Sequence, residues 1–226
     1  YYNRLESLGA AVFYQATVLD VVIRQRKFDG VLVDLDGTQH YQRARAVVLA
    51  SGGFEADKDW LASAWGDAAR NFLIRGTPYN TGEVLKGVLA GGADQVGDPT
   101  QCHAVAIDGR APEYDGGIVT RVDCVPFSVV VNNDGHRFYD EGEDVWPKRY
   151  AIWGRLVAKQ PNQVAYAIID SKSKDLFMPT VFSATVTDSL DDMAQQLGLP
   201  KDQFLATVKE FNESCQDGEF YPTELD

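Results

Sequence analysis

The strongest indication of fold class lies in Arg45-Ala46-Val47-Val48-Leu49-Ala50-Ser51-Gly52-Gly53-Phe54. A short, continuous apolar run that ends at glycines is typical of a strand buried on both faces. Because glycine has no side chain, the glycines indicate a place where another group approaches the backbone closely. We therefore expect a buried strand over residues 45–50, followed by either a plain strand-to-helix turn or a turn that lines a nucleotide or flavin.

Upstream of this run, the pattern predicts a small antiparallel meander. Residues 11–14 and 17–25 are rich in β-branched and aromatic side chains, and residues 31–35 form another such stretch. Asp36-Gly37 follows directly, and this dipeptide favours a tight reversal of the chain.

Downstream, helices and strands alternate irregularly. Helical spacing of apolar residues and turn signals predict five helices and three further strands. The expected helices cover residues 57–69, 81–90, 147–159, 189–197 and 202–215, and the expected strands cover 101–107, 117–132 and 164–169. Glycine pairs and Asp134-Gly135 mark the turns, and Gly198-Leu199-Pro200 separates the last two helices. The mixture indicates an α+β fold.

Composition narrows the class of protein. The 226 residues are 45% hydrophobic and carry a net charge of −12, which suits a globular core and disfavours nucleic acid and acidic lipid as partners. The sequence contains no apolar run long enough for a membrane span and no signal peptide. Cys102, Cys124 and Cys215 have neither disulfide nor zinc spacing, so a reducing cytoplasm and no metal are expected. Since the chain begins at Tyr1 within a helix-like stretch, we interpret it as an internal piece of a longer protein.

Two polar residues occur within the strand-like runs. His103 lies in the apolar run 101–105, where a histidine is either a hydrogen-bonded core residue or a catalytic group. Arg121 lies in the run 119–122, where it either faces solvent or needs an anionic partner.

Two further segments have a structural and a functional interpretation. Thr81-Gly82-Glu83 opens a helix, as an N-cap with an acidic first turn or as part of a flavin site. Lys148-Arg149 follows the acidic run 140–144, which indicates either a surface ion-pair cluster or a partly buried site beside Trp146, Tyr150 and Trp153.

In their order along the chain, these segments resemble the flavoprotein subunit of fumarate reductases and succinate dehydrogenases. The resemblance covers nearly the whole chain. It rests on Ala50-Ser51-Gly52-Gly53-Phe54, on Tyr79-Asn80-Thr81-Gly82-Glu83 and on Val131-Asn132-Asn133-Asp134-Gly135-His136-Arg137-Phe138-Tyr139-Asp140-Glu141. The stretches 75–82, 102–108 and 140–150 are similar to the tricarballylate dehydrogenase branch of that family.

The resemblance implies FAD as cofactor. It assigns residues 1–99 to part of the FAD-binding domain, with the meander and the buried strand, and residues 100–226 to the substrate-capping domain. The family's glycine-rich phosphate motif is absent from this sequence. Residues expected to lie along the flavin are Ser51, Gly52, Gly53, Thr81, Gly82 and Glu83.

For the substrate, the resemblance implies carboxylate binding. His103 matches the family's substrate-carboxylate histidine, although Ala104 stands where a proline usually follows. Thr120-Arg121 matches a Thr-Glu pair, so Arg121 replaces the glutamate of the proton relay, and Asp123 is a candidate substitute. Arg149 matches the catalytic arginine across a gap, with Lys148 or Arg155 as alternatives.

The implied reaction is FAD-dependent oxidation of tricarballylate to cis-aconitate, with a hydride passing to the flavin and a proton to an enzyme base. A tricarboxylate or dicarboxylate substrate and an electron-accepting redox partner follow from it. The alternatives are another fumarate reductase-like or 3-ketosteroid dehydrogenase-like flavoenzyme and, for this piece alone, an inactive capping module without flavin. Exposed core surface would favour dimerisation of such a piece.

Overall fold

The computed structural model describes residues 1–114 and 118–218, and it divides the chain into two compact units. The first unit comprises Tyr1–Asp57 and Tyr79–Asp98, and the second comprises Lys58–Pro78 and Pro99–Asp226. The assignment of residues 1–99 and 100–226 to a flavin part and a capping part stays a prediction.

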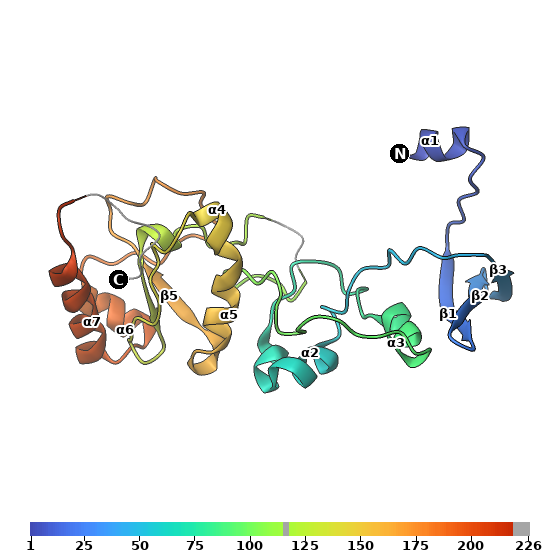
Figure 1. Ribbon diagram of the computed structural model, residues 1–226. Coiled ribbons are helices and arrows are strands. Elements are labelled where there is room, and N and C mark those ends of the chain that lie inside the picture. Colours follow the sequence, from blue (N-terminus) through green and yellow to red (C-terminus); the bar gives the residue numbers. More distant parts are fainter. Residues whose placement is uncertain (115–117, 219–226) are drawn as a thin grey trace. The chain divides into compact units, whose positions relative to one another are not determined.

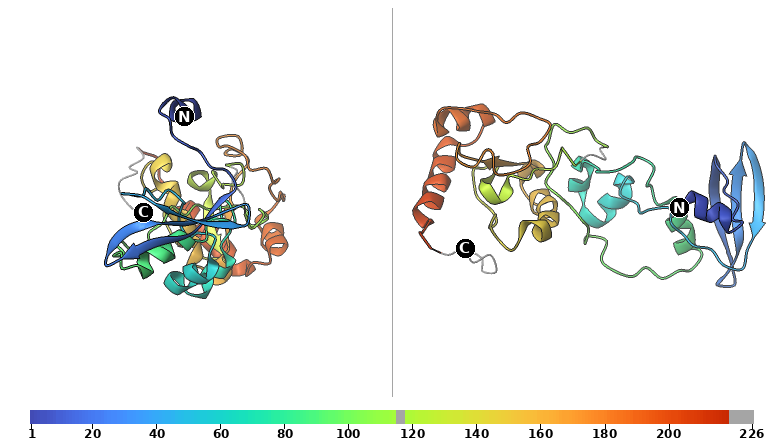
Figure 2. Two further views of the ribbon diagram at one scale, coloured as in Figure 1. Left: turned by 90° about the vertical axis from the view of Figure 1, so that its right-hand side faces the viewer. Right: turned by 90° about the horizontal axis from the view of Figure 1, so that it is seen from above.

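The first unit contains the expected meander (Figures 1 and 2). Its strands β1 (Ala16–Arg24), β2 (Lys27–Leu35) and β3 (Thr38–Arg43) pair antiparallel in sequence order. The reversal between β2 and β3 occurs at Asp36-Gly37, as predicted, with φ of 51° and 80°. Both angles are positive, as hairpin turns that match the strand twist require.

A helix packs against this sheet. The predicted helix 81–90 is α3 (Glu83–Ala90), which contacts β1. Gly91, at its end, lies so near Ile23 that an added Cβ would be 2.6 Å from Ile23 Cδ1. The N-cap is Gly82 in the left-handed conformation and not Thr81, since a φ of 73° suits glycine best. One more short helix, α1 (Tyr2–Ser7), begins the unit.

The buried strand predicted over residues 45–50 is wrong. These residues are outside any strand and are exposed, and Val48 is 90% exposed. An extended segment becomes a strand only when a neighbour satisfies its N–H and C=O groups, and no described strand pairs with this one. The predicted strand over residues 11–14 is absent for the same reason.

The second unit is built around a two-stranded antiparallel ribbon. Strands β4 (Val129–Asn132) and β5 (Ala165–Ile168) pair in register from Val129–Ile168 to Asn132–Ala165. β5 confirms the strand predicted over residues 164–169. Alternate residues of a strand face opposite sides, so a continuous apolar strand must be covered on both.

Helices supply that cover (Figure 1). Val129 and Val131 pack with Phe204 in a core that includes α6 (Leu190–Leu197) and α7 (Lys201–Ser214). On the other face, Val130 packs with Trp153 of α5 (Trp153–Ala158). The two predicted C-terminal helices are therefore confirmed, and Gly198 separates them with a φ of 68°.

The strands predicted over residues 101–107 and 117–132 are wrong except for β4, and Gly117 lies outside the described residues. The two segments do run past each other: Asp108 N–H donates to the Thr120 carbonyl at 2.9 Å, and Val122 N–H donates to the Ala106 carbonyl at 3.0 Å. Only a single bridge, Ile107–Arg121, results. The 3-10 turn η2 (Val125–Phe127) contains Pro126, which cannot donate to a sheet.

The remaining helices are broken versions of those expected. Residues 57–69 form α2 (Lys58–Trp65) and the 3-10 helix η1 (Asp67–Asn71), separated by Gly66 at a φ of 74°. Residues 147–159 form α4 (Trp146–Arg149), η3 (Tyr150–Ile152) and α5. A short turn, η4 (Pro161–Gln163), precedes β5. Among the described helices, none is both long and apolar enough to cross a bilayer.

Candidate functional site

The second unit gathers two of the predicted substrate residues around one aromatic ring. The guanidinium carbon of Arg121 lies 4.6 Å from the centre of the Tyr150 ring. The His103 ring meets the same tyrosine edge-on, with centroids 5.2 Å apart. A cation and an imidazole on one tyrosine form a surface that suits an anionic or carbonyl group.

Arg121 is anchored by an internal counter-ion. Its Nε and Nη2 donate to the two carboxylate oxygens of Asp123 at 2.6 and 2.8 Å. Trp146 Nε1 donates to the same carboxylate at 3.2 Å. Because of this hydrogen-bonded pair, the pKa of Arg121 lies above its ordinary value. The inward-facing interpretation, with an anionic partner, therefore holds for Arg121, whose side chain is 18% exposed.

His103 is held in place through its neighbour. Ala104 N–H donates to the Ala151 carbonyl at 3.0 Å, and the Ala104 carbonyl accepts from Gly154 N–H at 2.8 Å. A proline at residue 104 would lack the first donor. His103 itself is exposed, so its interpretation as a buried core histidine is wrong, because the loop 101–105 is not part of a sheet.

Thr120 is buried, with 4% of its surface exposed, and its carbonyl accepts from Asp108. It stands next to Arg121 in the chain, at the crossing with residues 106–108. The structure thus brings His103 and Arg121 to one ring and leaves Thr120 buried.

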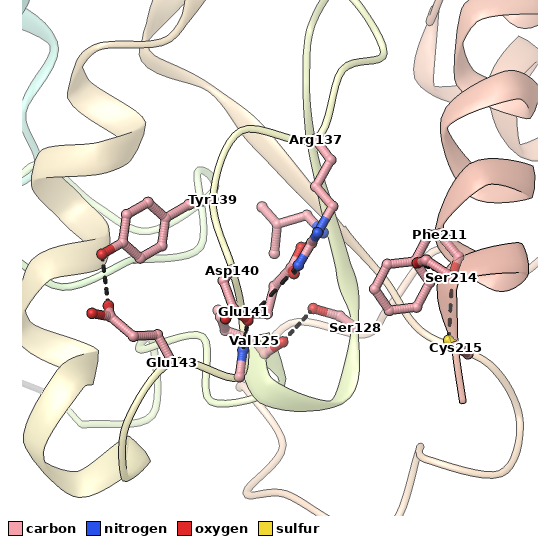
Figure 3. A network of polar contacts seen from close by, with 12 residues as sticks. Val125, Ser128, Arg137, Tyr139, Asp140, Glu141, Glu143, Phe211, Ser214 and Cys215 are labelled. Carbon is pink, nitrogen blue, oxygen red and sulfur yellow. Dashed lines mark hydrogen bonds and ion pairs between the residues drawn. The ribbon is translucent and has the colours of Figure 1, made fainter. Parts of the chain in front are cut away.

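Arg149 lies in a separate polar network. Its Nη2 donates to the Tyr139 hydroxyl at 3.0 Å and forms an ion pair with Glu143. The Tyr139 hydroxyl in turn donates to Glu143 at 2.6 Å (Figure 3). Hydrogen bonding to Glu143 raises the pKa of Arg149, and hydrogen bonds from Arg149 and Tyr139 lower the pKa of Glu143. Arg149 therefore keeps its proton, since its hydrogen-bonded pair with Glu143 favours the charged form.

The sequence interpretation missed a buried carboxylate. Glu141 is 5% exposed, accepts from Val130 N–H at 2.6 Å and pairs with Arg137 at 2.6 Å (Figure 3). Burial raises the pKa of Glu141, while Arg137 opposes the rise. The spacing of four residues between an arginine and a glutamate, directly after the turn at Asp134-Gly135, was the available signal. This pair ties the turn to β4, and its role is structural.

In the first unit, two of the predicted flavin segments lie against each other. Gly52 has a φ of 85°, and an added Cβ would lie 2.8 Å from Asn80 Oδ1. Asn80 is fixed by a bond from its Nδ2 to Glu55 Oε1 at 2.6 Å and by its carbonyl, which accepts from Ala56 N–H at 3.0 Å. Ser51-Gly52-Gly53 is thereby brought next to Thr81-Gly82, while Glu83 is exposed.

This arrangement fits part of a flavin site. Ser51 and Gly52 are exposed, Gly53 is partly so, and the close approach at Gly52 leaves no room for a side chain. No lysine or arginine belongs to these segments, so they would contact FAD through backbone N–H groups and the hydroxyls of Ser51 and Thr81. In the ranges 1–114 and 118–218, no group of three His, Cys, Asp or Glu side chains is placed to hold a metal ion.

Comparison with known proteins identifies the family. Residues 1–221 match the FAD binding domain family. The chain belongs to this family, and FAD is the cofactor that goes with it. The resemblance predicted from the sequence is confirmed at this level.

Two curated relatives show what the chain is similar to. It is 24% identical over 240 residues to 3-oxosteroid 1-dehydrogenase of Mycolicibacterium smegmatis, covering 95% of this chain and 41% of the relative. It is 25% identical over 200 residues to 4-oxocyclohexanecarboxylate 2-dehydrogenase of Sinomonas cyclohexanicum, covering 83% and 34%. The chain thus spans about two fifths or less of the length of these relatives.

Solved structures share the fold. A 3-ketosteroid Δ1-dehydrogenase from Sterolibacterium denitrificans aligns with a TM-score of 0.68 at 19% identity, covering 94% of this chain and 41% of that one. A flavocytochrome c3 fumarate reductase aligns with a TM-score of 0.61 at 19% identity, covering 99% and 40%. The chain therefore has the fold of the corresponding part of these flavoenzymes.

Proposed function

We propose that this chain is part of an FAD-dependent dehydrogenase that oxidises a carbon–carbon single bond next to a carboxylate or carbonyl group. The observation that carries the proposal is the placement of His103 and Arg121 on the Tyr150 ring, in a chain that belongs to an FAD-binding family. The relatives named above are dehydrogenases, which supports the reaction class.

One C–H bond of the substrate breaks, and its hydrogen leaves with both electrons; the neighbouring C–H bond breaks and releases a proton, and a C=C bond forms between the two carbons. FAD, which residues 51–53 and 81–83 would help to hold, would supply the hydride acceptor. His103 and Arg121 hold the activating group of the substrate and stabilise the negative charge that develops on it.

We propose that Arg149 accepts the substrate proton at the same time as it passes one of its own protons to Glu143. The pKa of Arg149 is raised, so a free neutral guanidine would form only at high cost. If Arg149 passes a proton to Glu143 as the substrate proton arrives, the neutral guanidine never forms. Tyr139, which contacts both side chains, keeps them in line.

For the substrate, we propose tricarballylate, with cis-aconitate as product. The support is the resemblance of residues 75–82, 102–108 and 140–150 to the tricarballylate dehydrogenase branch. The names of the relatives indicate a second candidate class, cyclic ketones. An electron-accepting redox partner and a cytoplasmic location belong to the same proposal.

The test is dye reduction by the FAD-loaded, full-length protein that contains this sequence. Tricarballylate, succinate, 4-oxocyclohexanecarboxylate and a 3-ketosteroid are compared at equal concentration. Turnover of tricarballylate alone supports the specific proposal. Turnover of a ketone alone moves the protein to the second class, and no turnover of any of the four overturns the proposed dehydrogenase.

A further inference from the structure

The second unit contains a cavity of about 500 Å³ whose wall is rich in cations. Its aromatic and apolar wall comes from the α2–η1 segment and from the helical segment 149–159. The lining consists of Ala64, Trp65, Ala68, Thr100, Gln101, Tyr139, Arg149, Ile152, Arg155, Leu156, Ala158 and Lys159. No aspartate or glutamate is among these residues.

The cations of this unit differ in how their charge is balanced. Arg121 pairs with Asp123, and Arg149 pairs with Glu143. Arg155, by contrast, donates its Nη1 to the neutral amide oxygen of Gln101. In the part of the chain that the structure describes, no carboxylate pairs with Arg155 or with the exposed Lys159. The cavity therefore has a positive charge that no carboxylate of the described residues neutralises.

Hydrogen-bond donors in the same wall also lack acceptors. Trp65 Nε1, Arg149 Nε and Arg155 Nε are buried, and no atom of residues 1–114 or 118–218 accepts from them. Buried donors are nearly always bonded, because an unpaired one costs about 1–3 kcal/mol. The unbalanced charge of Arg155 and Lys159 indicates a ligand that carries negative charge. The three unpaired donors behind the same wall show that its polar groups are not fully satisfied by the described residues.

The wall also limits the shape of the ligand. Trp65, Ile152 and Leu156 present apolar surface, which a bare inorganic ion would leave unused. A small organic acid uses both kinds of surface, since its carbon skeleton contacts the apolar side and its carboxylate contacts the guanidinium in a two-pronged fashion.

We infer that this cavity binds a carboxylate of a small organic acid, and that Arg155 is the residue that selects it. The identification of this acid as the substrate rests on the proposed function. Arg121 and Arg149 already have protein carboxylates as partners, so their charge is balanced and fewer of their N–H groups remain for a substrate carboxylate. At Arg155 it would displace only an amide.

The test is equilibrium binding of tricarballylate to the FAD-loaded, full-length protein, measured by calorimetry. Arg155→Gln should raise the Kd by about tenfold to a hundredfold, the range expected for one charge-assisted contact. Arg155→Lys should lose less, because it keeps the charge. Lys172→Gln, an exposed lysine away from the cavity lining, is the charge-matched control and should bind as the wild type does.

Two further readouts separate this inference from the proposed function. The neutral triamide of the same skeleton should bind weakly and equally to wild type and Arg155→Gln. If Arg155→Gln binds tricarballylate more weakly than the wild type, but the wild type does not oxidise it, the carboxylate site in the cavity is supported and the proposed reaction is rejected. Turnover with an unchanged Kd and KM in Arg155→Gln would overturn the inference about Arg155, while the proposed reaction would still hold. If Arg155→Gln fails to fold, the same measurement on Arg155→Lys decides.

Discussion

Arg121 and Asp123, two residues apart in the chain, form a two-pronged ion pair with Nε–Oδ1 and Nη2–Oδ2 distances of 2.6 and 2.8 Å. Asp123 is 7% exposed, and Trp146 donates to it as well. The pair means that the positive charge of Arg121, which was expected to bind the substrate, is already balanced by a carboxylate of the folded chain. It also makes Asp123 a counter-ion, where the sequence interpretation had it as a substitute relay group.

Removing this counter-ion should destabilise the protein. Asp123→Asn leaves the mostly shielded Arg121 without an ionised partner, so we expect the free energy of unfolding to fall by about 1.5–3 kcal/mol. Urea unfolding followed by tryptophan fluorescence measures it. Glu213→Gln breaks the exposed Lys209–Glu213 pair on α7 and serves as control, with a loss of at most about 0.5 kcal/mol. Equal losses in the two variants would contradict the buried-pair interpretation.

Gly52 should matter for flavin binding in a way that a comparable glycine does not. Gly52 and Gly37 have φ of 85° and 80°, but only at Gly52 would a Cβ meet another residue, Asn80. Gly52→Ala should push Asn80 and the following Thr81-Gly82 away and lower the FAD retained by the full-length protein. Gly37→Ala has the same backbone strain without this contact.

The measurement is the flavin absorbance per protein after purification. Full retention in Gly52→Ala, or equal losses in both variants, would show that the contact between Gly52 and Asn80 has no bearing on FAD.

Glu143 should make stability depend on acid pH. Its pKa in the folded protein is lowered by Arg149 and Tyr139, so its contribution is fully present above the unfolded pKa of about 4.3 and is lost as pH falls through the folded pKa. The difference in unfolding free energy between wild type and Glu143→Gln should therefore be largest near neutral pH and shrink below about pH 4.

Urea unfolding between about pH 3 and pH 7 measures this difference. Glu210→Gln, on the exposed face of α7, provides the control and should show no such trend. A Glu143 difference that stays constant with pH would contradict the Arg149–Glu143 pair.

The three cysteines should differ in reactivity. Cys102 and Cys215 are exposed, whereas burial raises the pKa of Cys124 to about 11. At pH 8 only about one thousandth of Cys124 would be thiolate, which is the reacting form. Brief iodoacetamide treatment followed by peptide mass spectrometry should find Cys102 and Cys215 labelled and Cys124 unlabelled. Early labelling of Cys124 would show that its surroundings open readily.

Local signals in the sequence were sufficient to predict much of the secondary structure. The hairpin turn at Asp36-Gly37, the helix ends at Gly91 and Gly198 and the turn at Asp134-Gly135 were predicted, because glycine conformation and apolar periodicity act over a few residues. The order of motifs along the chain was also sufficient to identify the family, and the match over residues 1–221 confirms it.

Tertiary structure decided what depends on partners distant in sequence. Residues 45–50 have the composition of a strand but no strand beside them, and the loop 101–105 carries His103 outside any sheet. Whether a segment becomes a strand depends on the hydrogen-bond groups of another segment, which composition does not contain.

The same reason governs the candidate site. The sequence by itself identified Arg121, Arg149 and, as an alternative, Arg155 as cations of interest. Only the folded chain showed that Asp123 and Glu143 neutralise the first two and that Gln101 leaves the third unbalanced. The free energy of a charge depends on the groups within a few ångströms of it, and those groups are brought together only when the chain folds.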